Sequence, residues 1–280
     1  WPYPIIYAII LFLVSIRYYL LFSRDKKDKL KNAFLNVFFV AAASYITPNF
    51  SIFAIFFTYK FLLEFKYTKN FFYIITLNFC LALPAFIFYY ILDFYILNIS
   101  VTVNTDTSIK FNLFNKVIII TSIIFFYFIP FLKINFFKKI FKELKILSQN
   151  YLIIIFTFIC ILFYNFPFGY GGGIFYHISY KLFSNSFFVF LVFIAALYIF
   201  KSIKIFNFNN ILIFICLILY NLQTSIFHKY FDPLLLFVFL FLLTFKTSST
   251  NFNLKEIMNK YYFLYFFFLA ASFYKVNFLS

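Results

Sequence analysis

Long, solidly apolar runs separated by short polar segments organise this sequence. Runs such as 117–128 and 234–243 lack the apolar–polar alternation of a barrel strand, so they favour helices, which satisfy their own backbone hydrogen bonds in lipid. The predicted fold class is all-α: a polytopic helical membrane protein with about eight to ten transmembrane helices in one domain over 1–280. The predicted spans are 3–22, 33–47, 50–65, 71–92, 117–132, 151–166, 187–200, 211–227, 234–245 and 261–274.

The second and third runs, 33–47 and 50–65, are each shorter than the ~20 residues that a full helical crossing needs. Pro48 separates them. They form either two short spans or one re-entrant hairpin broken at the proline. Both alternatives return the chain to the side of the membrane from which it started, so the rest of the topology is the same.

Composition supports a membrane location. The chain is 65% hydrophobic and 11% charged, whereas a soluble domain carries about a quarter charged residues. A water-soluble monomer is therefore excluded. The 54 Phe and 24 Tyr, like the many Ile, Asn and Lys residues, use AT-rich codons, so we attribute the aromatic content to a biased genome and not to a ligand site.

The distribution of basic residues predicts the orientation. The chain has a net charge of +16, and Arg24 with seventeen lysines falls in every second segment between the runs. The other segments hold only Lys110, Lys116, Lys181 and Lys229, with Arg17 and Lys275 near span ends. By the positive-inside rule the lysine-rich loops are cytoplasmic and the Trp1 end is extracytoplasmic. The expected location is integral to a bacterial inner membrane. The stretch 133–145 resembles an amphipathic helix on the anionic cytoplasmic leaflet.

Cysteine usage and the chain start add smaller expectations. Cys80, Cys160 and Cys216 each lie in an apolar run with no metal-ligand spacing, so neither a metal nor a cofactor is expected. The chain opens at Trp1 without an initiator methionine, which predicts an N-terminally truncated fragment. The expected partners are the lipid bilayer and a lipid-linked substrate, with no nucleic acid. The oligomeric state stays open.

Glycine and histidine gather in the predicted external segment 167–185. All four glycines lie within 169–173, and Gly171, Gly172 and Gly173 are consecutive. Successive glycine N–H groups can cradle an anion such as phosphate, although a plain turn explains them equally well. His177 follows one helical turn later. It is a candidate substrate-binding residue, or alternatively a polar side chain at headgroup level.

The remaining candidates lie in two other predicted external segments. His228 and Lys229 open the segment 228–233, where a cation suits the phosphate of a lipid carrier, and a snorkelling lysine is the alternative. Asp93 stands at the outer end of a predicted span. Its carboxylate is the candidate catalytic general base.

The segment Ala41-Ala42-Ala43-Ser44-Tyr45-Ile46-Thr47-Pro48-Asn49-Phe50, followed by an apolar return run, resembles the short bent helix pairs of GT-C type membrane glycosyltransferases. The late external segment with His228 and Lys229 is similar to that superfamily as well. The resemblance implies a polyprenyl-phosphate-linked sugar donor, with His228 and Lys229 as donor-phosphate ligands. The superfamily's carboxylate lies in the first external loop, which here would precede Trp1, so no catalytic residue is carried over.

The expected function is therefore transfer of a sugar from a polyprenyl-phosphate-linked donor at the extracytoplasmic face. Two alternatives remain. A transporter or lipid flippase would place ionisable residues within its spans, for which Lys60 and Glu64 are the best candidates. A non-catalytic membrane subunit would only pack against partners.

Overall fold

The structure is a computed structural model that describes residues 4–25, 27–91, 112–131, 151–166, 171–202, 207–220, 226, 231, 233–244, 259–262, 264–270 and 273. These residues are helical with no β-strand among them, apart from one isolated bridge between Gly171 and Ile226. The predicted all-α class is confirmed. The chain divides into two compact units, which we describe separately.

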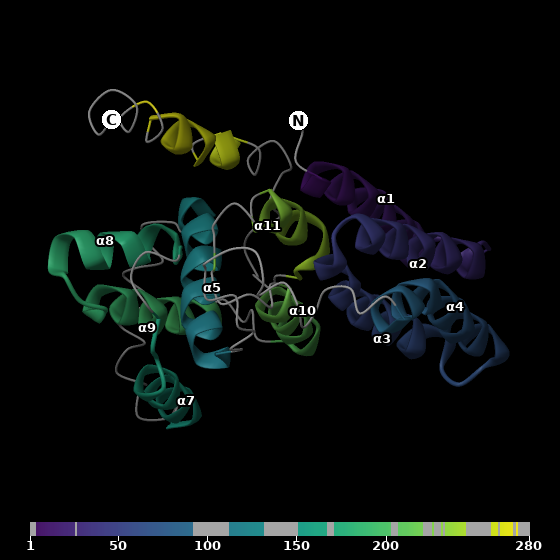
Figure 1. Cartoon of the computed structure of the whole chain (residues 1–280), viewed down its shortest axis with the longest axis horizontal. Helices are drawn as coiled ribbons and strands as arrows, with labels where there is room; N and C mark the ends of the chain where they lie inside the picture. Colours follow the sequence, from purple (N-terminus) through teal and green to yellow (C-terminus); the bar gives the residue numbers. More distant parts are fainter. Residues whose placement is uncertain are drawn as a thin grey trace. The chain divides into compact units, whose positions relative to one another are not determined.

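Unit 1 comprises 1–112, 208–225 and 230–243. Figure 1 shows its first four helices in purple to blue, and α2 contacts α1, α3 and α4. Its elements are α1 (Pro4–Arg24), α2 (Lys29–Ile46), the 3₁₀ helix η1 (Pro48–Ile52), α3 (Phe53–Phe65), α4 (Lys69–Ile91), α10 (Phe208–Leu219), α11 (Leu234–Phe237) and the π-helical turn η6 (Val238–Leu242).

Pro48 produces the chain reversal that the sequence predicts. Thr47 is extended, with φ −139° and ψ 102°, because the ring of a following proline disfavours the helical conformation. Helix α2 therefore ends at Ile46, and Pro48 begins η1, which leads directly into α3.

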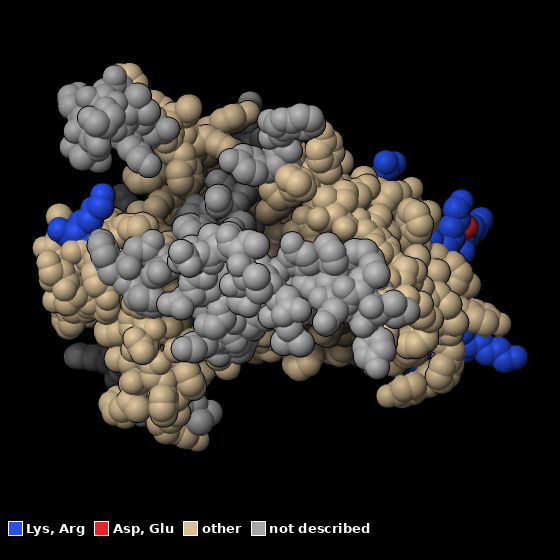
Figure 2. Space-filling view, viewed as in Figure 1, with Lys and Arg blue, Asp and Glu red and all other residues tan. Residues whose placement is uncertain are grey.

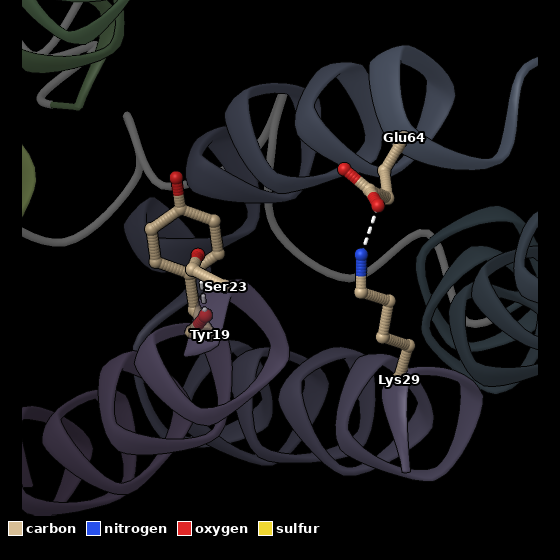
Figure 3. Close-up of polar contacts among 4 residues, drawn as sticks. All are labelled: Tyr19, Ser23, Lys29 and Glu64. Atoms are coloured by element: carbon tan, nitrogen blue, oxygen red, sulfur yellow. Dashed lines mark hydrogen bonds and ion pairs between the residues drawn. The ribbon is translucent and has the colours of Figure 1, made fainter. Parts of the chain in front are cut away.

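An ion pair shows the direction of the α3 return. Lys29, the first residue of α2, pairs with Glu64 near the end of α3. Figure 3 shows the lysine side chain reaching across to the carboxylate. The start of α2 and the end of α3 therefore lie at the same end of unit 1. Helix α10 also runs antiparallel to α3, because Phe208 contacts Tyr59 whereas Cys216 donates a hydrogen bond to the Ile52 carbonyl.

Aromatic rings form the core of unit 1. The ring centroids of Phe12 and Phe53 are 4.7 Å apart, and those of Phe50 and Tyr220 are 5.3 Å apart. All four side chains are fully buried. Nearby, Asn36 of α2 donates a hydrogen bond of 2.8 Å to the Ser15 carbonyl of α1, the kind of polar contact that joins helices where water is scarce.

Unit 2 comprises 113–207, 226–229 and 244–280. Its central helix contacts α7, α8 and α9 and is buried continuously from Asn115 to Phe128. Figure 1 shows this helix, α5, in teal with α8 and α9 in green. The elements are α5 (Leu113–Phe128), the 3₁₀ helix η3 (Ile129–Phe131), α7 (Tyr151–Leu162), α8 (Gly173–Phe183) and α9 (Phe187–Ser202), with further helical residues at 259–262 and 264–270.

A reciprocal amide contact aligns α5 with α7. The Asn115 side chain donates to the Asn165 carbonyl and accepts from the Asn165 N–H, both at 2.8 Å. The start of α5 thus lies beside the segment that follows α7. The ring centroids of Phe200, near the end of α9, and Phe128, at the end of α5, are 5.8 Å apart, so the end of α9 packs against the end of α5.

Among the described residues, two helices are long and apolar enough to cross a membrane: α1 over Pro4–Arg24 and α4 over Lys69–Ile87, with mean hydropathies of 2.2 and 1.8. Only 11% of the α4 window is buried, so α4 turns most of its apolar surface outward. Shorter apolar helices cover Leu113–Phe128, Ile153–Leu162, Phe187–Lys201 and Phe208–Leu219. Crossing by these shorter helices stays a prediction.

Basic side chains mark one end of unit 1, which we call its basic end. It consists of the turns from α1 to α2 and from α3 to α4, and Figure 2 shows blue side chains at that edge beside a largely tan surface. The exposed basic residues of these turns are Arg24, Lys27, Lys31, Lys66 and Lys69.

The predicted runs locate the helices well, but the segment 167–185 is not a simple loop. Helix α8 occupies Gly173–Phe183 within it. Its buried face consists of Gly173, Tyr176 and Ser179, the three-residue spacing of an amphipathic helix. Phe175 packs on Phe125 of α5, which places α8 along the flank of that helix.

Chemical cross-linking can test the α2–α3 reversal. In a chain with Cys80→Ala, we expect Lys29→Cys and Glu64→Cys to be joined by a short bifunctional maleimide, because the native side chains meet. The control pair, Lys29→Cys with Ser51→Cys, should stay unlinked, since α3 has 13 residues and spans about 20 Å. Equal cross-linking of both pairs, read by mass spectrometry of the peptides, would contradict the hairpin.

Candidate functional site

The glycine run is a buried, left-handed turn before α8. Gly171, Gly172 and Gly173 have φ of 95°, 105° and 78° and are all buried. The Gly172 N–H donates a hydrogen bond of 2.7 Å to the carbonyl of Ile226, and Gly171 forms a parallel bridge with the same residue. The structure thereby joins the predicted external segment 167–185 to the chain that leads into 228–233.

Gly172 is required by packing as well as by its backbone conformation. A Cβ atom at this position would lie 2.2 Å from Cδ1 of Tyr176, whose side chain is fully buried. The Tyr176 hydroxyl donates to the Phe166 carbonyl at 3.4 Å, and its ring packs edge-on against the Phe166 ring. The ring therefore has little freedom to move away from a new methyl group.

These contacts limit how the glycine run can hold an anion. The Gly172 N–H already donates to Ile226, so it is not a free anion donor. Gly172 is also the N-cap residue of α8, and the first N–H groups of a helix have no intrahelical acceptor. The predicted anion contact thus rests on Gly173 and the residues that follow it, whereas Gly172 has a structural role.

His177 lies on the exposed side of α8, one turn beyond Gly173. Its pKa is lowered, first by partial burial, which disfavours the charged imidazolium, and second by the positive charge of Lys181 one turn further on. The imidazole is therefore neutral at pH 7. A neutral imidazole can accept a proton or a hydrogen bond, but it does not neutralise a phosphate charge.

The other predicted site residues, Asp93, His228 and Lys229, lie outside the described residues. The sequence places His228 two residues after Ile226. Two residues of backbone reach at most about 7 Å. The contact between Ile226 and the glycine run therefore links two candidate regions. One is α8 with His177, and the other is the segment that carries His228 and Lys229.

The structure also places polar residues that the sequence patterns did not single out. Lys116 was predicted to lie in an external loop, but it is the fourth residue of α5 and only 1% exposed. Tyr180 of α8 shares a hydrogen bond of 3.3 Å with Ser186. The signal for Lys116 was weak, because a lysine at the border of an apolar run fits a loop end as well as a first helical turn.

The predicted transporter candidates Lys60 and Glu64 are not paired with each other. Glu64 is paired with Lys29, whereas the Lys60 amine lies 5.5 Å from the ring centroid of Phe56, a cation–π distance. Both residues stand on the C-terminal half of α3, towards the basic end. An ion pair between two helix ends explains Glu64 without any substrate path.

Within the described part of the chain, no cluster of three or more His, Cys, Asp or Glu side chains could hold a metal ion. Comparisons with known proteins add no relative: no family model, curated protein or solved structure matches this chain. The function must therefore be argued from the residues and their geometry.

Substitution of Gly172 tests the turn. We expect Gly172→Ala to destabilise the protein by about 1–3 kcal/mol through backbone strain alone, with a further loss from the clash with Tyr176. The unfolding of purified protein in detergent measures both effects. In Gly172→Ala/Tyr176→Ala the clash is absent, so the double variant should be more stable than the sum of the single losses implies. Additivity within about 0.5 kcal/mol would contradict the predicted contact.

Proposed function

We propose that this chain is a polytopic integral membrane protein with a cytoplasmic basic end, and that it transfers a sugar from a polyprenyl-phosphate-linked donor at the extracytoplasmic face. The observation that carries the transfer proposal is the contact between the glycine run and Ile226, because it connects the two predicted external segments that hold the candidate donor ligands.

Outward-facing apolar side chains support the membrane location. On α4, Phe72, Phe79 and Phe86 are each more than half exposed, and on α7 Phe158 is 65% exposed. Contiguous apolar surface of this kind is rare on soluble monomers. In a bilayer the same rings would contact lipid.

The contacts between helix ends within each unit support the predicted alternation of the segments between two sides of a membrane. In unit 1, the Lys29–Glu64 pair places two predicted cytoplasmic turns at one end. The contact between Phe50 and Tyr220 places two predicted external helix ends together. In unit 2, the Asn115–Asn165 contact also joins two predicted external ends. Each contact joins segments that the positive-inside assignment puts on the same side, and the lysine distribution alone carries the choice of side.

The proposed chemistry is a displacement at the anomeric carbon of the donor. The bond between that carbon and the phosphate oxygen breaks, an acceptor hydroxyl oxygen forms the new glycosidic bond, and polyprenyl phosphate leaves with the bonding electron pair. Lys229 and His228 would hold the phosphate and stabilise its developing charge. Asp93 would accept the proton of the acceptor hydroxyl. The neutral His177 would hydrogen-bond to the sugar or the acceptor.

The buried Lys116 favours a second candidate function, transport of a lipid-linked or anionic substrate. An ionisable side chain inside a membrane helix commonly marks a substrate path, and Lys116 stands on the most deeply buried helix of unit 2. This function requires Lys116 and does not require His228 or Lys229.

Maleimide labelling tests the membrane orientation. With Cys80→Ala as background, we expect Asn49→Cys to react with a membrane-impermeant maleimide on intact cells. Lys66→Cys should react only after permeabilisation, because it lies at the basic end. The inverse pattern would contradict the orientation, and labelling of both positions on intact cells would contradict a membrane crossing between them.

Sugar transfer can be tested with synthetic polyprenyl-phosphate hexoses in proteoliposomes, by measuring the release of polyprenyl phosphate. We expect Lys229→Ala to reduce turnover by about 10²-fold or more, because loss of a donor aimed at developing charge has effects of that size. Lys229→Arg should retain most activity, and the control Lys69→Ala, at the exposed basic end, should match the unaltered protein.

Normal turnover in both His228→Ala and Lys229→Ala would overturn the proposed donor site. If Lys116→Gln instead abolishes movement of the labelled lipid across the bilayer while no variant releases polyprenyl phosphate, the transport function replaces glycosyl transfer.

A further inference from the structure

Unit 1 contains a cavity of about 540 Å³. It is lined by the C-terminal half of α2, by η1, by Ala54 near the start of α3 and by the second half of α4. The lining is remote from the basic end, because α2 leads away from that end and α4 begins there. Binding pockets for small molecules commonly measure about 300–1,000 Å³, so the volume is sufficient for a ligand.

Small side chains keep this space open. Four of the twelve alanines of the chain line the cavity: Ala41, Ala54, Ala82 and Ala85. Ser44 and Ser51 line it as well. Protein interiors are close-packed, and this chain has 54 phenylalanines whose large rings could fill such a space. The concentration of small residues around one space therefore indicates a formed cavity and not a chance packing defect.

Two prolines and one tyrosine shape the walls. Pro48 ends α2 at the rim, and Pro84 lies inside α4, where it has no N–H to donate to the Cys80 carbonyl. The Tyr45 hydroxyl donates a hydrogen bond of 2.5 Å to the neighbouring Leu81 carbonyl. This bond ties α2 to α4 beside the proline, so the spacing between the two helices is fixed across the cavity.

The polar groups of the lining are all uncharged. Asn78 donates to Thr58 at 3.4 Å and to the Ile74 carbonyl at 3.2 Å, and the Ser44 hydroxyl donates to the Val40 carbonyl. Among the described residues, no Lys, Arg, His, Asp or Glu lines the cavity. A charged ligand would lose its hydration here without a counter-charge, whereas a hydrocarbon chain would gain from leaving water.

We infer that this cavity binds a long hydrocarbon chain of a membrane lipid. The exposed apolar face of α4, with Phe79 and Phe86 beside the lining residues, would meet the bilayer, so a lipid chain can reach the cavity from the surrounding hydrocarbon. The inference rests on the proposed membrane location and is independent of sugar transfer. A bilayer phospholipid and a polyprenyl carrier share this chemistry and are separated by the experiment.

Photo-cross-linking of the full chain in lipid nanodiscs tests the site. One arm uses phosphatidylcholine with a diazirine in its acyl chain, and the other uses a diazirine-bearing polyprenyl phosphate. We expect adducts mapped by mass spectrometry to concentrate in 40–54 and 78–85. Adducts from only one probe identify that lipid as the occupant, and adducts from both assign a general hydrocarbon site.

Filling the cavity provides the control. Ala82→Phe places a ring in the space and should reduce adducts in 40–54 by about fivefold or more, the effect of roughly 1 kcal/mol. Ala195→Phe makes the same change at an exposed position of α9 outside the lining and should leave the adducts unchanged. Adducts spread evenly over exposed apolar surfaces and unaffected by Ala82→Phe would overturn the site. A chain that inserts in nanodiscs but fails this test leaves the membrane proposal intact.

Discussion

The structure depends on the constraint that backbone N–H and C=O groups must find partners within the chain. The chain has 11% charged residues and outward-facing aromatic rings, so few polar groups surround its backbone. Helices satisfy the backbone N–H and C=O groups locally. Exceptions occur where prolines or glycines interrupt a helix. Pro84 has no N–H to donate to the Cys80 carbonyl, and the Gly172 N–H donates to the Ile226 carbonyl outside any helix. Both candidate binding regions lie at such interruptions among the described residues.

The packing within each unit follows from the same composition. Unit 1 is assembled around interlocking rings, including Phe12, Phe50, Phe53 and Tyr220, whose edge-to-face contacts provide orientation as well as area. Polar contacts are few and specific. The Lys29–Glu64 pair is partly exposed, so it contributes little to stability. It shows that the end of α3 lies beside the start of α2. The small residues around the α2–α4 cavity differ from this pattern, since they leave open a space that large rings fill elsewhere in the unit.

The sequence predicted the helices well and the site only in part. Each apolar run with described residues contains a helix, because run length and solid hydropathy are local signals that tertiary contacts do not override here. Pro48 correctly predicted the chain reversal after α2, because the effect of a proline on the preceding residue is also a local signal. The helix α8 and the burial of Lys116 were missed, because both depend on neighbours distant in the sequence: Tyr176 packs against Phe166, and α5 is covered by three other helices. The link from Gly172 to Ile226 joins positions 54 residues apart, which spacing alone cannot indicate. The sequence singled out Gly172 as part of the glycine run, but it could not indicate that a side chain at this position would clash with Tyr176.

The Asn115–Asn165 contact has a consequence for the biogenesis of the protein. These two residues are separated by 50 positions, and a ribosome adds about 5–20 residues per second. Helix α5 therefore emerges roughly 3–10 seconds before its amide partner has been made. In the proposed membrane topology, the Asn115 amide has to be accommodated during that interval by water or by the insertion machinery, since a bare amide in hydrocarbon is costly. On that proposal helix α5 leaves the insertion site late, together with α7, and the order of helix synthesis need not be the order of helix release into the bilayer.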